Sequence, residues 1–226
     1  MSFLSFFKDY KKFGIFFSTL CLIIIIAIYS VLNQDNERLP VYQPSDFETK
    51  LVDSSIQHIE KYHTVADFKL INQNGDTITQ NNYKDKIYIT DFFFTTCQTI
   101  CPIMTSNMLD IQKVIKDDSE VMLLSHSVTP EIDSVAQLKR YAIKKGVIDE
   151  KWNLVTGDRK QIYDLARKSY MVVEDDGLNN YGMIHTENFA LIDKNKRIRG
   201  TYNGISKAGI DSLLRDLETL KKEYEQ

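Results

Sequence analysis

Cysteine is scarce in this sequence, which holds three among its 226 residues. A structural zinc site normally takes four ligands, and no second cysteine pair is present to complete one. Excess positive charge is also lacking, since the formal net charge is −3 and no basic stripe runs along the chain. We therefore expect no nucleic-acid partner. Internal repeats and long low-complexity tracts are absent as well, and a 43% hydrophobic fraction is typical of a globular protein.

Charged residues are missing from the run Phe13–Leu32, whose side chains are mostly large and apolar. A helix of this length is about what a bilayer crossing needs, and a helix satisfies its own backbone hydrogen bonds in lipid. Lys8, Lys11 and Lys12 precede the run. The positive-inside rule therefore predicts a cytoplasmic N-terminus over residues 1–12, a transmembrane anchor over residues 13–32 and a C-terminal part across the membrane.

A cleaved signal peptide is the alternative interpretation of this run. The run is long for such a peptide, and no small-x-small cleavage site follows it. Cys21 would mark a lipoprotein site only after small residues, and Ser18-Thr19-Leu20 precedes it. We therefore expect an uncleaved anchor, with Cys21 as a thiol without chemistry.

Residues 33–64 are polar and mixed, with Pro40 and Pro44 near their start, which predicts a linker or an irregular lead-in. His58 and His63 lie near its end without a third ligand close by, so we interpret both as surface histidines. The folded domain is expected over residues 65–226.

Turn residues and hydrophobic spacing predict the elements of this domain. Strands are expected over 67–71 and 77–79 as a hairpin, then over 87–94, 121–128, 187–192 and 197–202. Helices are expected after Pro102, over 134–145 before Gly146, after an Asp158–Gln161 capping pair, and from Ser206 onward. Strands that alternate with helices predict an α/β fold, a mixed sheet with helices on both faces. A thioredoxin-like domain satisfies this order.

Cys97 and Cys101 lie in CQTICP, between a buried strand and a helix. Helix N-termini stabilise a thiolate, and a helical first turn would place residues four apart on one side. Such a pair can form a disulfide or bind a soft metal ion. Two buried structural cysteines are the alternative, since a bare C-x-x-x-C is a weak motif.

Two histidines compete for the place of a third ligand. His185 directly precedes a predicted strand, where domains of this kind hold functional groups. His126 lies in the middle of an apolar strand, which favours a hydrogen-bonded core histidine. Two thiolates and one imidazole suit Cu(I), and the same set accepts Cu(II) with one added ligand.

Four sequence blocks in order resemble the SCO/SenC family. They are DFFFTTCQTICPIMTSNM, SVTPEIDSVAQLKRYA, the WNLVTG beginning at Trp152, and GMIHTENFALID, within about residues 65–205. The resemblance implies a thioredoxin-like fold facing the periplasm from the inner membrane, with copper bound by Cys97, Cys101 and His185. It also implies a role in building the binuclear copper centre of cytochrome c oxidase subunit II, without indicating a copper donor. Gln98, Thr129, Ile132 and Thr186 depart from the family pattern, and none of them removes a ligand.

Two classes of function remain open at this point. A metallochaperone binds copper and passes it on without catalytic turnover, so no enzyme activity is expected of it. A membrane-anchored thiol–disulfide oxidoreductase would instead reduce the cysteines of the oxidase copper site. His185 discriminates between them, because exchange needs only the cysteines. A peroxidase is the weaker interpretation, since Arg140, on a predicted helix surface, is the only nearby arginine.

Overall fold

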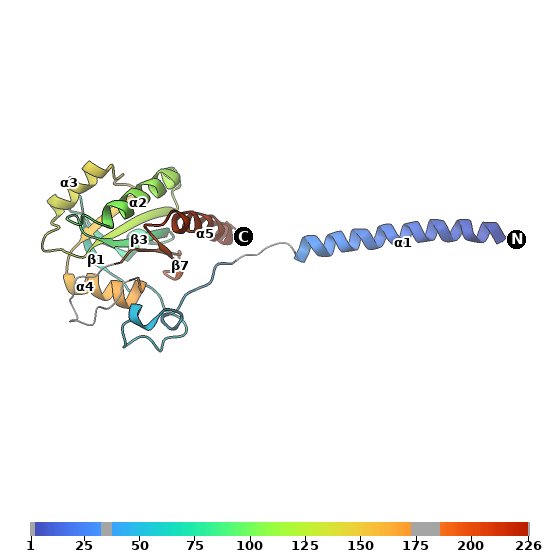
Figure 1. Ribbon diagram of the computed structural model, residues 1–226, viewed down its shortest axis with the longest axis horizontal. Helices are drawn as coiled ribbons and strands as arrows, with labels where there is room; N and C mark the ends of the chain where they lie inside the picture. Colours follow the sequence, from blue (N-terminus) through green and yellow to red (C-terminus); the bar gives the residue numbers. More distant parts are fainter. Residues whose placement is uncertain (1–2, 33–37, 173–185, 226) are drawn as a thin grey trace. The chain divides into compact units, whose positions relative to one another are not determined.

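The computed structural model describes residues 3–32, 38–172 and 186–225 (Figure 1). The chain divides into two units, residues 1–38 and residues 39–226. The first unit consists of the helix α1 (Phe3–Leu32), which includes the predicted apolar run. Large apolar side chains of α1 are exposed, namely Ile15, Phe16, Phe17, Leu20, Leu22, Ile23, Ile24, Ile25, Ile26 and Ile28. Within the described ranges, no helix meets the length and hydropathy that a membrane crossing takes, and the anchor stays a prediction.

The second unit is an α/β domain around a mixed sheet, which has seven strands among the described residues in the order β2-β1-β5-β4-β3-β6-β7. At its centre, β3 (Ile87–Phe93), β4 (Val121–Ser127) and β5 (Trp152–Thr156) run parallel. The predicted hairpin forms one edge as β1 (Lys69–Asn72) and β2 (Thr77–Thr79). The predicted closing pair, β6 (Asn188–Ile192) and β7 (Ile198–Asn203), forms the other edge. It runs antiparallel to β3, which makes the sheet mixed as predicted.

Helices cover both faces of the sheet (Figure 1). The apolar stripes of α2 (Cys101–Ile115), α3 (Val135–Lys145) and α5 (Lys207–Glu225) pack on one face. The other face holds α4 (Arg159–Asp164), the π-helical turn η4 (Leu165–Tyr170) and the chain before β1. All seven residues of β3 are buried, as its apolar sequence predicts for a strand covered on both sides.

The strand β5 is absent from the predicted order of elements, which is a correction. Its sequence WNLVT mixes polar with apolar residues, yet all five are buried. The amide of Asn153 is satisfied across the fold, because it accepts from Asn72 Nδ2 at 3.0 Å and donates to Tyr83 Oη at 2.9 Å. Partners that lie far away in sequence therefore stabilise this strand.

The compact domain begins at Leu39, so most of the predicted linker packs on it as an irregular lead-in. Two short 3₁₀ turns, η1 (Pro44–Asp46) and η2 (Thr49–Leu51), are its only helical parts among the described residues. Buried Arg199 holds its start, donating to the carbonyl oxygens of Leu39 and Pro40 and to the carboxylate of Glu223.

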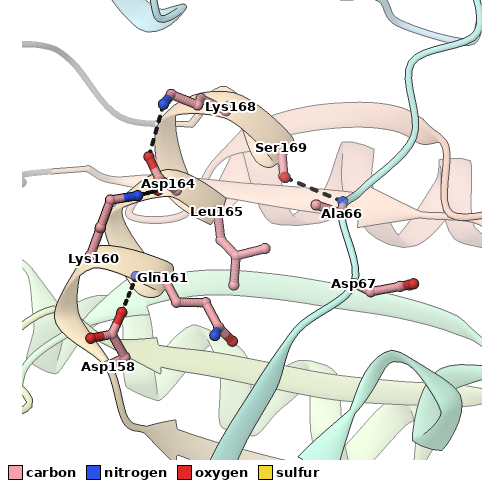
Figure 2. Close-up of a pocket in the computed structure, with 9 residues that line it drawn as sticks. All are labelled: Ala66, Asp67, Asp158, Lys160, Gln161, Asp164, Leu165, Lys168 and Ser169. Carbon is pink, nitrogen blue, oxygen red and sulfur yellow. Dashed lines mark hydrogen bonds and ion pairs between the residues drawn. The ribbon is translucent and has the colours of Figure 1, made fainter.

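The end of the lead-in is held at η4, where the backbone N–H of Ala66 donates to Ser169 Oγ at 3.3 Å (Figure 2). His63 is half-buried rather than a surface residue, because its Nε2 lies 3.0 Å from the carbonyl oxygen of Ser169. His58 is exposed, as predicted.

Candidate metal centre

Three connections meet at the end of the sheet where the parallel strands β3 and β4 finish. This end is called the carboxyl-terminal edge, as distinct from the outer edge strands. The parallel strands β3 and β4 end there together, with Phe93 opposite Ser127. β6 runs antiparallel to β3, so its first residue, Asn188, lies at this same edge. The edge therefore holds the loop with Cys97, the loop that follows β4, and the chain that leads into β6. The carboxyl ends of such strands are where open α/β sheets bind ligands.

Cys101 is the first residue of α2, and Pro102 follows it inside the first turn. Cys97 lies before the helix in a turn, where its backbone N–H donates to the carbonyl oxygen of Phe94 at 3.3 Å. The predicted helical spacing therefore does not bring the thiols together. Cys97 lies in the loop before α2, close enough to Cys101 for the two thiols to shift each other's pKa. Both thiols are free.

The two thiols differ in acidity. Partial burial tends to raise the pKa of Cys97, but hydrogen bonds from the backbone N–H groups and side chains of Cys101 and Thr99 outweigh it and lower this pKa to about 7. Burial raises the pKa of Cys101 to about 12, and the nearby charges of Cys97 and Asp91 add to that rise. Cys97 is therefore the thiolate and the nucleophile near neutral pH, while Cys101 keeps its proton until a metal or a disulfide replaces it.

Asp133, which no sequence motif marks as a site residue, supports the loop that carries Cys97. Its fully buried carboxylate accepts from the N–H and hydroxyl of Thr95, at 3.1 and 2.5 Å. It also accepts from the hydroxyls of Ser127 and Thr129, at 2.6 and 3.2 Å. The signal available in the sequence was an aspartate shortly after a buried strand, among small hydroxyl residues.

His185, the predicted third ligand, lies outside the described residues. Thr186, the next residue, is described and buried, and its hydroxyl donates to the carbonyl oxygen of Val172. Within the described part of the chain, no group of three or more histidine, cysteine, aspartate or glutamate side chains is arranged to hold a metal ion. The structure thus brings together Cys97 and Cys101 and leaves His185 a prediction.

His126 is a core residue, as predicted. It is fully buried, its Nδ1 lies 3.2 Å from Thr90 Oγ1, and its ring stacks on Phe92 with the centroids 4.7 Å apart. Burial lowers its pKa to about 3, which keeps the ring neutral.

A separate cavity of about 350 Å³ lies between the lead-in and α4 with η4 (Figure 2). Its lining includes Asp67, Asp158 and Asp164, and Asp164 is paired with Lys160 and Lys168. No cysteine or histidine lines it, so it offers no soft ligands.

Comparison with known families decides what kind of protein this is. The family model described as SCO1/SenC matches residues 56–222. The chain belongs to the SCO1/SenC family. A SCO1 protein homolog of Bacillus subtilis (strain 168) is 31% identical over 159 residues, which are 70% of this chain and 82% of that protein.

Solved structures of Sco proteins share the thioredoxin-like fold of this SCO1/SenC chain. BsSco, described as a member of the Sco family of cytochrome c oxidase assembly proteins with a disulfide switch, is 29% identical with a TM-score of 0.60. The match covers 70% of this chain and 93% of BsSco. ScoI of Bradyrhizobium japonicum, solved with copper bound, is 26% identical with a TM-score of 0.56, over 70% of this chain and 99% of ScoI.

Proposed function

We propose that this chain is a copper metallochaperone that holds copper with Cys97, Cys101 and His185. The observation that carries the proposal is the pair of free thiols at the N-terminus of α2, at the edge where β6 begins. His185 stands three residues before β6 in sequence, so the chain length allows it to reach the same edge. Copper is supported by the copper-bound ScoI of Bradyrhizobium japonicum and by the softness of two sulfurs with one imidazole.

In this proposal copper is the cargo, and the residues bind it reversibly. Cys97 offers a thiolate near neutral pH, whereas the buried Cys101 must release its proton when the metal binds. The recipient we propose is subunit II of cytochrome c oxidase, at its binuclear copper centre. The description of BsSco as a cytochrome c oxidase assembly protein supports an oxidase partner.

A thiol–disulfide oxidoreductase is the second candidate, and the acidity difference between the two thiols favours it. Cys97 is placed to attack a partner disulfide as a thiolate, and Cys101 lies behind it to resolve the mixed disulfide. The disulfide switch named for BsSco supports redox chemistry in a relative. Under this reading the chain reduces the cysteines of the oxidase copper site, so that they can accept copper.

We also propose that residues 13–32 anchor the chain in the inner membrane in a single pass, with the domain in the periplasm. The uncharged run, the three lysines before it and the exposed apolar side chains of α1 support the anchor. A reporter fused after Gln226 tests the orientation. A reporter active only outside the cytoplasm is expected, and activity of a cytoplasm-only reporter would overturn the assignment.

The variant His185→Ala separates the two functions, and His58→Ala is its matched control because His58 is exposed and remote in sequence. The chaperone proposal expects His185→Ala to lose coloured Cu(II) binding and oxidase assembly in cells. Its Cys97 thiol should still react with a model disulfide, because hydrogen bonds from Cys101 and Thr99, rather than the imidazole, lower the pKa of Cys97. His58→Ala should behave like the parent in all three assays.

Two results would count against the chaperone. Parent-like Cu(II) spectra in His185→Ala would show that His185 is no ligand. If oxidase assembly also survived, function would rest on Cys97 and Cys101 alone, and the oxidoreductase would be the better assignment.

A further inference from the structure

A groove of about 400 Å³ opens beside Cys97. One side of it comes from the cysteine loop and the start of α2, with Thr95, Gln98 and Pro102. The other side is a face of α3, formed by Gln137, Arg140, Tyr141, Lys144 and Lys145. These α3 positions recur every three or four residues, so they share one face of the helix.

Direct contacts fix this face of α3 to the cysteine loop. Gln137 donates from Nε2 to Thr95 Oγ1 at 3.0 Å, two residues before Cys97. Its Oε1 accepts from Arg140 at 2.7 Å, so the guanidinium is oriented by the residue that holds the loop. Tyr141 in turn hydrogen-bonds Thr105 of α2 at 2.7 Å. The groove is therefore a built feature, and Arg140 is held beside the cysteine loop through Gln137.

The charge of this groove opposes the charge of the chain. Arg140, Lys144 and Lys145 line it, and no acidic side chain does. In the described ranges none of the three forms an ion pair, although Lys145 lies over the Tyr141 ring at 5.5 Å. The chain as a whole has a net charge of −3. Lys144 and Lys145 also complement the dipole at the end of α3, but Arg140 lies too far inside the helix for that role.

We propose that this groove docks an acidic, carboxylate-rich peptide segment of the protein that exchanges copper or thiols with Cys97. Complementary charge supports this occupant, since three cations in a groove that no acidic side chain lines would hold carboxylates. The amide of Gln98 adds a hydrogen-bond donor to the same lining. Cys97 lines the same groove, so a docked segment brings its own sulfur or metal ligand to the exchanging atom. This inference deepens the proposed function by naming the partner's chemistry, and it holds for either exchange reaction.

The test measures how fast Cys97 reacts with two peptide disulfides, using the reduced, metal-free full-length chain in nonionic detergent. The probes are a short glutamate-rich peptide and its glutamine counterpart, each with one cysteine blocked as a 2-pyridyl disulfide. The Cys97 thiolate forms a new S–S bond to the peptide sulfur, the old S–S bond breaks, and the electron pair leaves on pyridine-2-thiolate. Release of this product is read by absorbance. The ratio of the two rates cancels changes in the thiolate fraction of Cys97.

The parent should react about tenfold faster with the glutamate peptide at low ionic strength. The triple variant Arg140→Gln/Lys144→Gln/Lys145→Gln should bring the ratio near one. A control variant carries the same charge change on exposed residues elsewhere, Lys116→Gln/Lys207→Gln/Lys222→Gln. It should keep the parent's preference for the glutamate peptide. In 1 M salt, where the Debye length is about 3 Å, the parent should lose its preference too.

A parent without preference, or a groove variant that keeps it, would overturn the docking site. If the triple variant does not fold, the single exposed change Lys144→Glu replaces it, and it should lower the ratio several-fold. The peptide assay contains no copper, so its outcome is independent of copper binding. If the parent failed to bind copper, that would count against the proposed function, and the measured preference for the glutamate peptide would still stand.

Discussion

Thr186 hydrogen-bonds Val172 through its hydroxyl, and the two residues flank positions 173–185 in the chain. The same hydroxyl accepts from the backbone N–H of Asn188 at 3.1 Å, at the start of β6. One side chain thus ties the end of η4 to the sheet edge where Cys97 lies. Thr186 stands where the SCO/SenC pattern has serine, and both residues carry the hydroxyl that this contact uses.

The first prediction follows from this contact. Thr186→Val keeps the size of the side chain and removes the hydroxyl that fixes the residue next to His185. We expect copper affinity, measured by competition with a chelator, to fall about tenfold, as for residues that orient metal ligands. Thr186→Ser should stay close to the parent. An unchanged affinity in Thr186→Val would show that this contact does not position the ligand.

The second prediction concerns the reactivity of the two thiols. Alkylation of Cys97 by iodoacetamide in the metal-free chain should rise with pH to half its maximum near pH 7, because only the thiolate reacts. Cys101, with its pKa raised to about 12 by burial, should react far more slowly throughout. Peptide mass spectrometry after timed quenching reads both sites. Equal rates at pH 7 would contradict the assignment of Cys97 as the nucleophile.

The third prediction tests Asp133 as the support of the cysteine loop. Asp133→Asn places an amide NH₂ among donors that need an acceptor, so a buried hydroxyl or N–H loses its partner. The free energy of unfolding should fall by about 1–3 kcal/mol, measured by urea denaturation. Asp117→Asn is the matched control, since its side chain is 90% exposed, and it should change little. Equal losses of unfolding free energy in the two variants would contradict the assignment of Asp133 as the support of the cysteine loop.

The fourth prediction uses the buried His126, whose pKa is lowered to about 3 by burial. The unfolded chain takes up this proton near pH 6.5 and the folded chain does not, so protonation destabilises the fold as pH falls below 6.5. His126→Phe removes that effect. The stability of the variant relative to the parent should therefore rise by about 1.4 kcal/mol for each pH unit below 6.5.

Asp91 makes the comparison with the parent necessary. Burial raises its pKa to about 7, so its contribution to stability is present at low pH and is lost as pH rises toward 7. It opposes the effect of His126 in the parent and remains in the variant. Urea denaturation of both proteins between pH 4 and 7 isolates the histidine, and a constant difference would contradict the prediction.

Local signals in the sequence predicted most of the fold. Turn residues located the hairpin of β1 and β2, apolar runs located β3 and β4, and Ser134 and Gly146 bounded α3 as its two caps. The strand β5 was not predicted, because its polar residues are typical of an exposed segment. Asn153 is buried there because Asn72 and Tyr83 hydrogen-bond its amide. The sequence left open whether residues 33–64 are a linker or an irregular lead-in, because Arg199, which holds their packed part, lies about 160 residues away in the chain.

The sequence by itself determined the chemistry available to this protein: two cysteines at the junction of a buried strand and a helix, and an SCO/SenC pattern around them. Only the tertiary structure decided how that chemistry is arranged. The loop before α2, rather than helical spacing, brings the two thiols together and separates their acidities. The parallel ends of β3 and β4 bring Asp133 beneath that loop, and α3 sets a cationic face beside Cys97. Local sequence encodes backbone preferences within a few residues, whereas burial, hydrogen bonding and charge at this site depend on segments that only folding brings into contact.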